Sequence, residues 1–406
     1  MKNPFKNIGP GTLVAAAFIG PGTVTVCTLA GVRFGFELLW AMALSIFATI
    51  VLQEMAARLG LVSGKGLAAT VKEQIKTPWL KVAAIVLIVS AILVGNAAYE
   101  AGNISGGVLG LQTVLQDAFL NIGGLQLNYV SVLIGILAFV LLFIGNYKII
   151  ERSLITLVIV MSLSFVLAAV MTSPDWVMVL KGVFVPVVPS ESILTVIALV
   201  GTTVVPYNLF LHASLVQEKW KGAHQLAAAR KDLYVSIILG GVVSMAIIIC
   251  AAGIQQQNIT NAADLAKGLE PLYGPISKYV LSLGLFAAGI TSAITAPLAA
   301  AYVARDCFGW KKNLKSVAFR AVWMVVLVLG VVFSSVGFTS IEIIQFAQVA
   351  NGLLLPVIAG FLLWVVHKKT VLGAYSNTRL QTIFGLIIVL ATLILGARSL
   401  YKVFFT

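Results

Sequence analysis

The residues most able to do chemistry in this chain lie beside two breaks in otherwise apolar segments. The first break reads Gly20-Pro21-Gly22-Thr23 and the second reads Val204-Val205-Pro206-Tyr207-Asn208. Proline removes a backbone donor and clashes with the preceding turn, so each break frees backbone carbonyls beside a polar side chain. In hydrocarbon such groups survive only in a protein interior or a water-filled cavity. Paired breaks in the two halves of a membrane chain indicate the substrate site of a transporter.

Amide and hydroxyl groups add to this set. Tyr207 contributes a hydroxyl, and Gln348 and Asn351 carry amides about one helical turn apart in a later apolar segment. Neutral oxygen atoms suit hard cations, and the same groups bind a polar organic solute by hydrogen bonds. Within a membrane span an amide also commonly bridges helices, and a threonine commonly bonds to its own helix.

Titratable residues within apolar segments are the candidates for coupling or gating, because a buried charge is costly there. Glu54 stands four residues before Arg58, and an ion pair within one helix accounts for it. Glu100 has no obvious local partner. His212 lies one turn beyond Asn208 and is predicted to be either a proton-carrying group or a hydrogen-bonded packing residue.

The composition places these residues in a membrane. The chain has 406 residues, of which 60% are hydrophobic and 10% charged, whereas a soluble domain has roughly 25% charged residues. A bilayer-spanning helix needs about 20 apolar residues. Eleven segments are predicted to span: Thr12 to Phe34, Leu38 to Arg58, Val82 to Leu109, Leu127 to Asn146, Leu154 to Met171, Ile193 to Val216, Leu233 to Ile254, Ile276 to Tyr302, Val317 to Phe338, Ile341 to Val366 and Thr382 to Tyr401.

We therefore predict an all-α integral membrane protein with a single transmembrane domain over residues 1–406. Five spans in each half would invert the second half relative to the first, so that both breaks lie near the middle of the membrane. The predicted parts are repeat one (about 9–172), repeat two (about 190–367) and an extra helix (about 381–402). Gly102, Gly106 and Gly110 have the spacing that lets helices pack closely.

Charge predicts the orientation. The net charge is +13, and 21 of the 27 Lys and Arg residues fall in segments on the N-terminal side of the membrane. By the positive-inside rule the N-terminus is cytoplasmic and the C-terminus outside. The lipid bilayer therefore explains the charge, no nucleic-acid partner is expected, and a bacterial inner membrane is the expected location. The loops 172–192 and 255–277 are expected outside, and 60–81, with a short helix, inside.

The sequence lacks the signature motifs of several enzyme classes. The sequence contains no Walker loop, no dinucleotide-binding fingerprint and no His-Glu-x-x-His. Cys27, Cys250 and Cys307 are scattered, which gives neither a disulfide framework nor a metal-ligand spacing. Neither an enzymatic activity nor a cofactor is expected.

At this point the residues resemble the natural resistance-associated macrophage protein (NRAMP) family of proton-coupled divalent-metal transporters. The resemblance runs in order through ten spans. It is carried by Gly9-Pro10-Gly11, the first break, Phe34-Gly35-Phe36-Glu37-Leu38-Leu39-Trp40, Gln53 to Lys65, Val205 to Ser214, Gly289 to Ala301, Gln348-Val349 and Leu355-Pro356. It implies an inverted five-plus-five architecture with broken helices one and six, plus one extra helix.

The departures from the family concern the cation site. The family pattern has Asp-Pro-Gly-Asn in span one and Met in span six, where this chain has Gly20, Thr23 and Val205, and Tyr207 replaces a His. Both the formal charge and the thioether are absent, which removes the basis for choosing manganese over magnesium or calcium. The candidate substrate-binding residues are Gly20, Thr23, Val205, Tyr207, Asn208, Gln348 and Asn351. Of these, Thr23, Asn208 and Gln348 are the candidate metal ligands.

The proton route that the resemblance implies is altered as well. The family's two acidic positions in span three fall on Asn96 and Tyr99, and Arg320 matches one Arg of a family pair whose other position is Phe319. Asn and Tyr do not relay protons near neutral pH as a carboxylate does. Proton coupling of the family type is therefore not expected. The coupling or gating candidates are Asn96, Glu100, His212 and Arg320.

Three functions remain open on the sequence. The first is a secondary transporter of divalent cations with an uncharged oxygen site, favoured by the resemblance. The second is a transporter of a small polar organic solute such as an amino acid, because helix N-termini at the breaks would favour a carboxylate. The third is a sensor or scaffold derived from a transporter. A fold alone does not decide among them.

Overall fold

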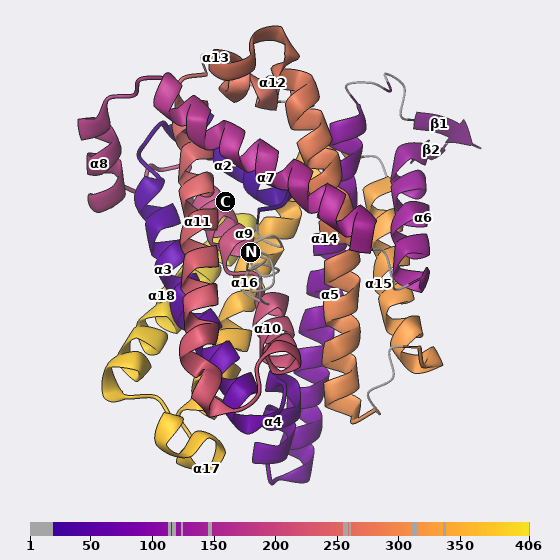
Figure 1. Ribbon diagram of the computed structural model, residues 1–406, viewed down its shortest axis with the longest axis vertical. Coiled ribbons are helices and arrows are strands. Elements are labelled where there is room, and N and C mark those ends of the chain that lie inside the picture. The colour runs from indigo at the N-terminus through magenta and orange to yellow at the C-terminus, as the bar shows by residue number, and fades with distance from the viewer. Residues whose placement is uncertain are drawn as a thin grey trace, which may run out of the picture.

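The computed structural model describes residues 19–112, 115, 119–122, 125–144, 148–254, 259, 261–310, 315–335 and 338–405. Its architecture is a bundle of long helices (Figure 1), because a segment in lipid must satisfy its backbone hydrogen bonds internally. The long helices and the two halves of the broken span are α2 (Pro21–Phe34), α3 (Leu39–Ser63), α5 (Pro78–Leu111), α6 (Tyr129–Ile144), α7 (Lys148–Met171), α9 (Ile193–Thr203), α10 (Pro206–Lys219), α11 (Leu226–Ala252), α14 (Ser277–Phe308), α15 (Val317–Ser335), α16 (Ser340–Val366) and α18 (Arg379–Phe405).

These helices coincide with the predicted spans, the sixth being divided between α9 and α10. In the described part of the chain, eight helices are long and apolar enough to cross a membrane. A ninth span follows if the bent pair of α7 and α8 (Trp176–Phe184) counts as one. Helix α6 is shorter, and α2 is the described part of the first predicted span. The N-terminal part of that span, with Gly9-Pro10-Gly11, lies outside the described residues.

The connecting elements cap the two ends of the bundle. Helices α12 (Ala262–Ala266) and α13 (Glu270–Tyr273) lie at the upper end in Figure 1, and α4 (Leu67–Gln74) and α17 (Lys369–Leu372) lie at the lower end. The predicted short helix in loop 60–81 is confirmed by α4. Single 3-10 turns accompany these elements at η2 (Ala223–Gln225), η3 (Lys267–Leu269), η4 (Gly274–Ile276) and η5 (Gly373–Tyr375).

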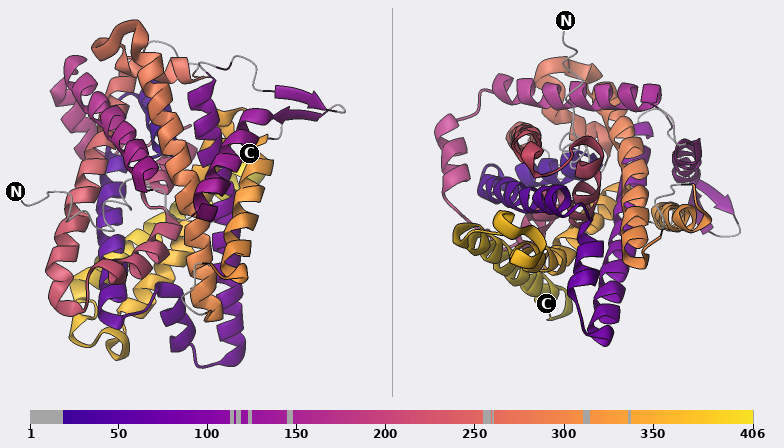
Figure 2. Two further views of the ribbon diagram at one scale, coloured as in Figure 1. Left: turned by 45° about the vertical axis from the view of Figure 1, so that its right-hand side comes forward. Right: turned by 60° about the horizontal axis from the view of Figure 1, so that its bottom comes forward.

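One connection differs from the purely helical expectation. Strands β1 (Phe119–Ile122) and β2 (Leu125–Asn128) form an antiparallel hairpin with Phe119 opposite Asn128. It projects sideways from the bundle (Figure 2). Leu125-Gln126-Leu127-Asn128 alternates apolar and polar residues, which suits a strand, so the fourth span begins at Tyr129 rather than at Leu127.

The helices pack in pairs that cross between the two halves of the chain. Helix α14 lies along α5 through most of its length (Figure 1), with α15 and α6 beside that pair. Helix α2 packs on α11, and α3 packs on both α9 and α10. Helix α16 contacts α2, α5 and α9. The two breaks and α16 therefore meet in the middle of the bundle.

Three glycines of α5, spaced four residues apart, let it pack closely against α16, α2 and α14. Gly102 faces Ala347 of α16, Gly106 lies against the Pro21 ring at the start of α2, and Gly110 faces the backbone of α14. At Gly106 and Gly110 an added Cβ would overlap its neighbours, so only glycine permits the approach. This confirms the predicted close packing, which also fixes the position of the first break.

Candidate functional site

Both breaks are regular helix starts at proline. Helix α2 begins at Pro21 after Gly20, whose backbone is extended at φ −104° and ψ −175°. Helix α9 ends at Thr203, Val204 and Val205 are non-helical, and α10 begins at Pro206. Proline suits the first helical position because its missing N–H is not needed there. The N-termini of α2 and α10 therefore both lie at the breaks.

Polar atoms without hydrogen-bond partners gather on these elements. Among the described residues, both amide atoms of Asn208, Oε1 of Gln348, Nδ2 of Asn351 and the Thr25 hydroxyl are buried and unpartnered. Leaving a buried polar group unsatisfied costs roughly 1–3 kcal/mol. Such a group in a native structure calls for an explanation, of which the binding of a water, an ion or another ligand is one. The cluster has the character of a ligand site.

Gln348 connects α16 to both breaks. A Cβ on Gly22 of α2 would overlap the Gln348 amide, and a Cβ on Gly201 of α9 would overlap the Gln348 backbone carbonyl. The absence of side chains at these two glycines thus lets α16 reach α2 and α9 at once. Three of the predicted elements meet at this residue.

Thr23 of α2 lies beside α9. Its hydroxyl lies 2.8 Å from that of Thr202 on α9, so it contributes to packing between α2 and α9. Sequence reasoning missed Thr202, which comes only three residues before Val205 within an apolar run. Pro206, which follows Val205, was the one local signal that this part of α9 borders a break.

Tyr207 and Asn96 have packing partners. The Tyr207 ring packs edge-to-face on Tyr99 of α5 with centroids 5.3 Å apart. The Asn96 amide donates to the carbonyl of Ala296 on α14 at 2.8 Å. Asn96 thus bridges the two longest helices of the core, as an intramembrane amide commonly does.

Glu100 is fully buried on α5. Its Oε2 is 3.4 Å from Nδ2 of Asn103, while Oε1 has no partner among the described residues. The side chain runs beside Gly330 of α15, where an added Cβ would overlap it. It therefore faces the α5–α15 contact, while the neighbouring residue, Tyr99, faces Tyr207.

His212 forms a contact that the sequence did not predict. Its Nδ1 lies 2.9 Å from Oε1 of Gln53 on α3, and its Nε2 is buried without a partner. Gln53 was part of the motif that carries the family resemblance, but nothing local related it to a residue 159 positions away.

Two further charged residues lie outside this cluster. The Arg320 guanidinium stacks on the Phe143 ring, 4.4 Å from its centroid, at the ends of α15 and α6. Glu54 pairs with Arg58 at 3.1 Å, as predicted, and also with Arg230 of α11 at 2.7 Å. Arg58 in turn donates to the Tyr375 carbonyl. This ion network joins α3 and α11 to the segment before α18.

The cluster at the breaks carries no formal charge. In the part of the chain that the structure describes, no three His, Cys, Asp or Glu side chains converge as a metal-binding group. Amide, hydroxyl and backbone groups make up the site, which suits a partly hydrated cation or an uncharged or zwitterionic solute better than a bare divalent ion.

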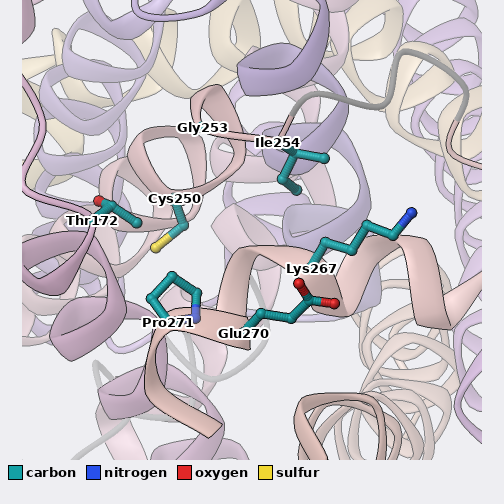
Figure 3. A pocket seen from close by; sticks show the side chains of 7 residues that line it. All are labelled: Thr172, Cys250, Gly253, Ile254, Lys267, Glu270 and Pro271. Atoms are coloured by element: carbon teal, nitrogen blue, oxygen red, sulfur yellow. The ribbon is translucent and has the colours of Figure 1, made fainter. Parts of the chain in front are cut away.

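A separate cavity opens near the upper end of the bundle. It has a volume of about 610 Å³ and lies between the ends of α7 and α11 and the α13 region (Figure 3). Its lining includes Thr172, Cys250, Lys267, Glu270 and Pro271. Lys267 also pairs with Asp264 at 3.4 Å. None of the predicted site residues lines it.

Comparison with known proteins supports the family resemblance. The family described as natural resistance-associated macrophage protein-like matches residues 11–402. A divalent metal cation transporter MntH of Caldanaerobacter subterraneus subsp. tengcongensis is 24% identical over 413 residues, covering 99% of this chain and 94% of that protein. A protein of the same description from Verminephrobacter eiseniae is 26% identical over 408 residues, covering 98% and 89%.

Solved structures agree with the fold. A manganese transporter of Eremococcus coleocola superposes with a TM-score of 0.76 at 18% identity, covering 99% of this chain and 88% of that one. MhsT in complex with L-phenylalanine gives a TM-score of 0.59 at 15% identity, covering 97% and 99%. At these identities the likeness concerns the fold alone.

Proposed function

Because the chain belongs to the natural resistance-associated macrophage protein-like family, we propose that it is a secondary transporter of divalent metal cations with an uncharged oxygen site. The observation that carries the proposal is the group of unpartnered buried atoms on Asn208, Gln348 and Asn351 at the two breaks. Family relatives described as divalent metal cation transporters support the substrate class.

The proposed ligands are Thr23, Asn208 and Gln348, with backbone carbonyls beside Gly20 and Val205. With neither carboxylate nor thioether at the breaks, a divalent ion would keep part of its water shell. Those waters would donate hydrogen bonds to the amide oxygens. The site itself would then discriminate weakly between manganese, magnesium and calcium.

The helix contacts support two inverted repeats. The first broken helix, α2, packs on α11, and the second, α9 with α10, packs on α3. These contacts exchange places when the first five spans are matched with the next five. We propose repeats of about 9–172 and 190–367, with the extra helix 381–402 outside them. The orientation by positive charge puts α10 on the cytoplasmic side.

Transport is proposed to proceed without proton coupling of the family type. Asn96 donates its amide to Ala296, Tyr99 packs on Tyr207, and Phe319 packs edge-to-face on Tyr302. None of these side chains relays protons near neutral pH, and Arg320 stacks on Phe143. At the positions of the family's proton route, this chain therefore has other residue types, and their side chains pack against neighbouring helices.

The organic-solute alternative rests on a specific observation. Nδ2 of Asn208 and Nδ2 of Asn351 are unpartnered donors, and donors cannot coordinate a cation. Together with the N-termini of α2 and α10 they would suit a carboxylate.

Uptake into proteoliposomes tests these functions. Manganese, magnesium and calcium are supplied separately and recorded with ion-sensitive dyes, and a pH-sensitive dye records the lumen. We expect saturable cation uptake that is lost in Asn208→Ala, retained in Asn261→Ala at the outer surface, and accompanied by no lumenal acidification.

Two results would contradict the proposal. If folded protein carries none of the three cations, the organic-solute function takes its place and amino acids become the substrates to test. Substrate-driven acidification that disappears in Glu100→Gln would overturn the uncoupled mechanism while leaving cation transport intact.

A further inference from the structure

His212 presents a free ring nitrogen to the protein interior. Its imidazole is completely buried on α10, and Nδ1 lies 2.9 Å from Oε1 of Gln53. An amide oxygen accepts but does not donate, so Nδ1 must carry the hydrogen of this bond. In the neutral ring Nε2 then has an unshared lone pair. That nitrogen has no partner in the described structure.

The free nitrogen follows the oxygen site along the same helix face. Asn208 precedes His212 by four residues, and side chains with this spacing lie one above the other on a helix. Both amide atoms of Asn208 are also buried and unpartnered. Two successive turns of α10 therefore offer an amide oxygen and an imidazole nitrogen to the same ligand.

A purely structural role explains the hydrogen bond of Nδ1 in His212 but not the burial of Nε2. The bond to Gln53 holds α3 and α10 together through Nδ1, but a buried unpaired Nε2 costs roughly 1–3 kcal/mol. The same packing with an apolar side chain would avoid that cost. A ligand that binds Nε2 removes it.

We propose that Nε2 of His212, with Oδ1 of Asn208, forms a second cation station that favours transition-metal ions over magnesium and calcium. Imidazole nitrogen suits iron, nickel, copper and zinc, whereas magnesium and calcium prefer oxygen ligands. Manganese also takes mainly oxygen ligands but accepts an imidazole nitrogen beside them, and it serves as the paramagnetic probe. This inference rests on the proposed function, since α10 is the half-span through which a cation would leave the oxygen site. The station supplies the selectivity that the Val205 side chain, which has no ligand atom, does not.

Gln53 is the positioning residue of this station. By accepting from Nδ1–H it fixes the tautomer and ring orientation that leave Nε2 free, as outer-shell partners of metal-binding histidines do. In Gln53→Leu the imidazole is retained but its tautomer and orientation are not held. The affinity for manganese is expected to fall about tenfold in that variant.

Electron spin-echo spectroscopy on bound manganese tests the ligand directly. The variant His224→Gln/His367→Gln leaves His212 as the single histidine, because the chain has three. We expect nuclear modulation from a directly bound nitrogen, changed when histidine is labelled with ¹⁵N. Adding His212→Gln should abolish it. Bound manganese without a histidine nitrogen signal would overturn the proposal, and so would a lack of manganese binding by the folded protein.

Uptake separates this inference from the function on which it rests. In His212→Gln, manganese uptake at subsaturating concentration is expected to fall about tenfold, with magnesium uptake unchanged. His367→Gln is the matched control and should change neither. If the unmodified protein carries cations and Asn208→Ala stops it, but His212→Gln leaves the manganese-to-magnesium ratio unchanged, only the second station is refuted. If no cation is carried at all, the proposed function itself fails.

Discussion

At the scale of single residues, the candidate site is identified by buried polar atoms that have no hydrogen-bond partner in the described structure. Asn208, Gln348 and Asn351 retain free amide atoms in the interior, whereas Asn96 and Thr23 have direct partners in Ala296 and Thr202. All five are polar residues in apolar segments and look alike in the sequence. Their surroundings separate the side chains that bridge two helices, Thr23 included, from those whose amide atoms have no protein partner.

Val205 tests whether the missing thioether limits manganese binding. In Val205→Met a soft sulfur donor is introduced at the break, and we expect manganese affinity to rise about tenfold, or ~1.4 kcal/mol. Calcium affinity should not change. Calorimetry with each ion is the measurement. Val204→Met is the matched control, since both valines are fully buried and share the overpacking cost of about 1–3 kcal/mol.

An equal rise in both methionine variants would show that the gain comes from repacking and not from a ligand at position 205. No rise in either would place Val205 outside the cation path.

At the scale of elements, α16 connects the parts of the candidate site by contacting both α2 and α9. Gly22 and Gly201 let α16 approach at Gln348, and Gly106 of α5 receives the Pro21 ring. Protein interiors are close-packed, so an added methyl group at these points would force the backbones of the two helices apart. The site is thus built from helix–helix approaches that depend on glycine.

Gly201 and Gly360 are a matched pair of glycines within long helices. In Gly201→Ala the Cβ would overlap the Gln348 carbonyl, so α9 and α16 must separate. We expect a loss of about 1–3 kcal/mol in stability together with a loss of uptake. Gly360, also on a long helix, has nothing within 4 Å of a Cβ. Gly360→Ala is expected to stabilise by up to about 1 kcal/mol.

Thermal unfolding in detergent and uptake into proteoliposomes provide the two measurements. Gly201→Ala with normal stability and normal uptake would refute the close approach of α9 to α16. The Gly360 variant shows whether an alanine in a membrane helix is harmful in itself.

At the scale of the whole molecule, the bundle has two chemically different ends. Helices α4 and α17 lie toward the end expected in the cytoplasm, and α12 and α13 lie at the other. The Glu54–Arg58–Arg230 network joins the former end, because Arg58 donates to the Tyr375 carbonyl directly after α17. The eleven predicted spans would put the two chain termini on opposite sides. By the positive-inside rule, the excess of Lys and Arg predicts which side is cytoplasmic.

Reporter fusions test this orientation. Alkaline phosphatase fused after Thr406 is expected to be active, because that side of a bacterial inner membrane is oxidising and permits its disulfides. The same enzyme fused after Ser376, before α18, is expected to be inactive. Green fluorescent protein at the two positions should give the reverse pattern. Activity at both positions, or at neither, would contradict a single crossing by α18.

The sequence by itself determined the membrane class, the positions of the spans and the two breaks. These are local properties, because about 20 apolar residues suffice to cross lipid and proline ends a helix wherever it stands. The intrahelical pair of Glu54 and Arg58 was likewise predictable from its spacing of four. The hairpin of β1 and β2 was missed because two four-residue strands give too few alternating positions to be distinguished from the start of the apolar span that follows.

The partners of each polar side chain were decided only by the tertiary structure. Thr202 beside Thr23, Gln53 beside His212, and Arg230 beside Glu54 come together across 179, 159 and 176 residues. No pattern along the chain encodes such contacts, because they depend on how helices from the two halves pack side by side. Sequence therefore identified the candidates, while packing divided them into structural bridges and groups that remain free for a ligand.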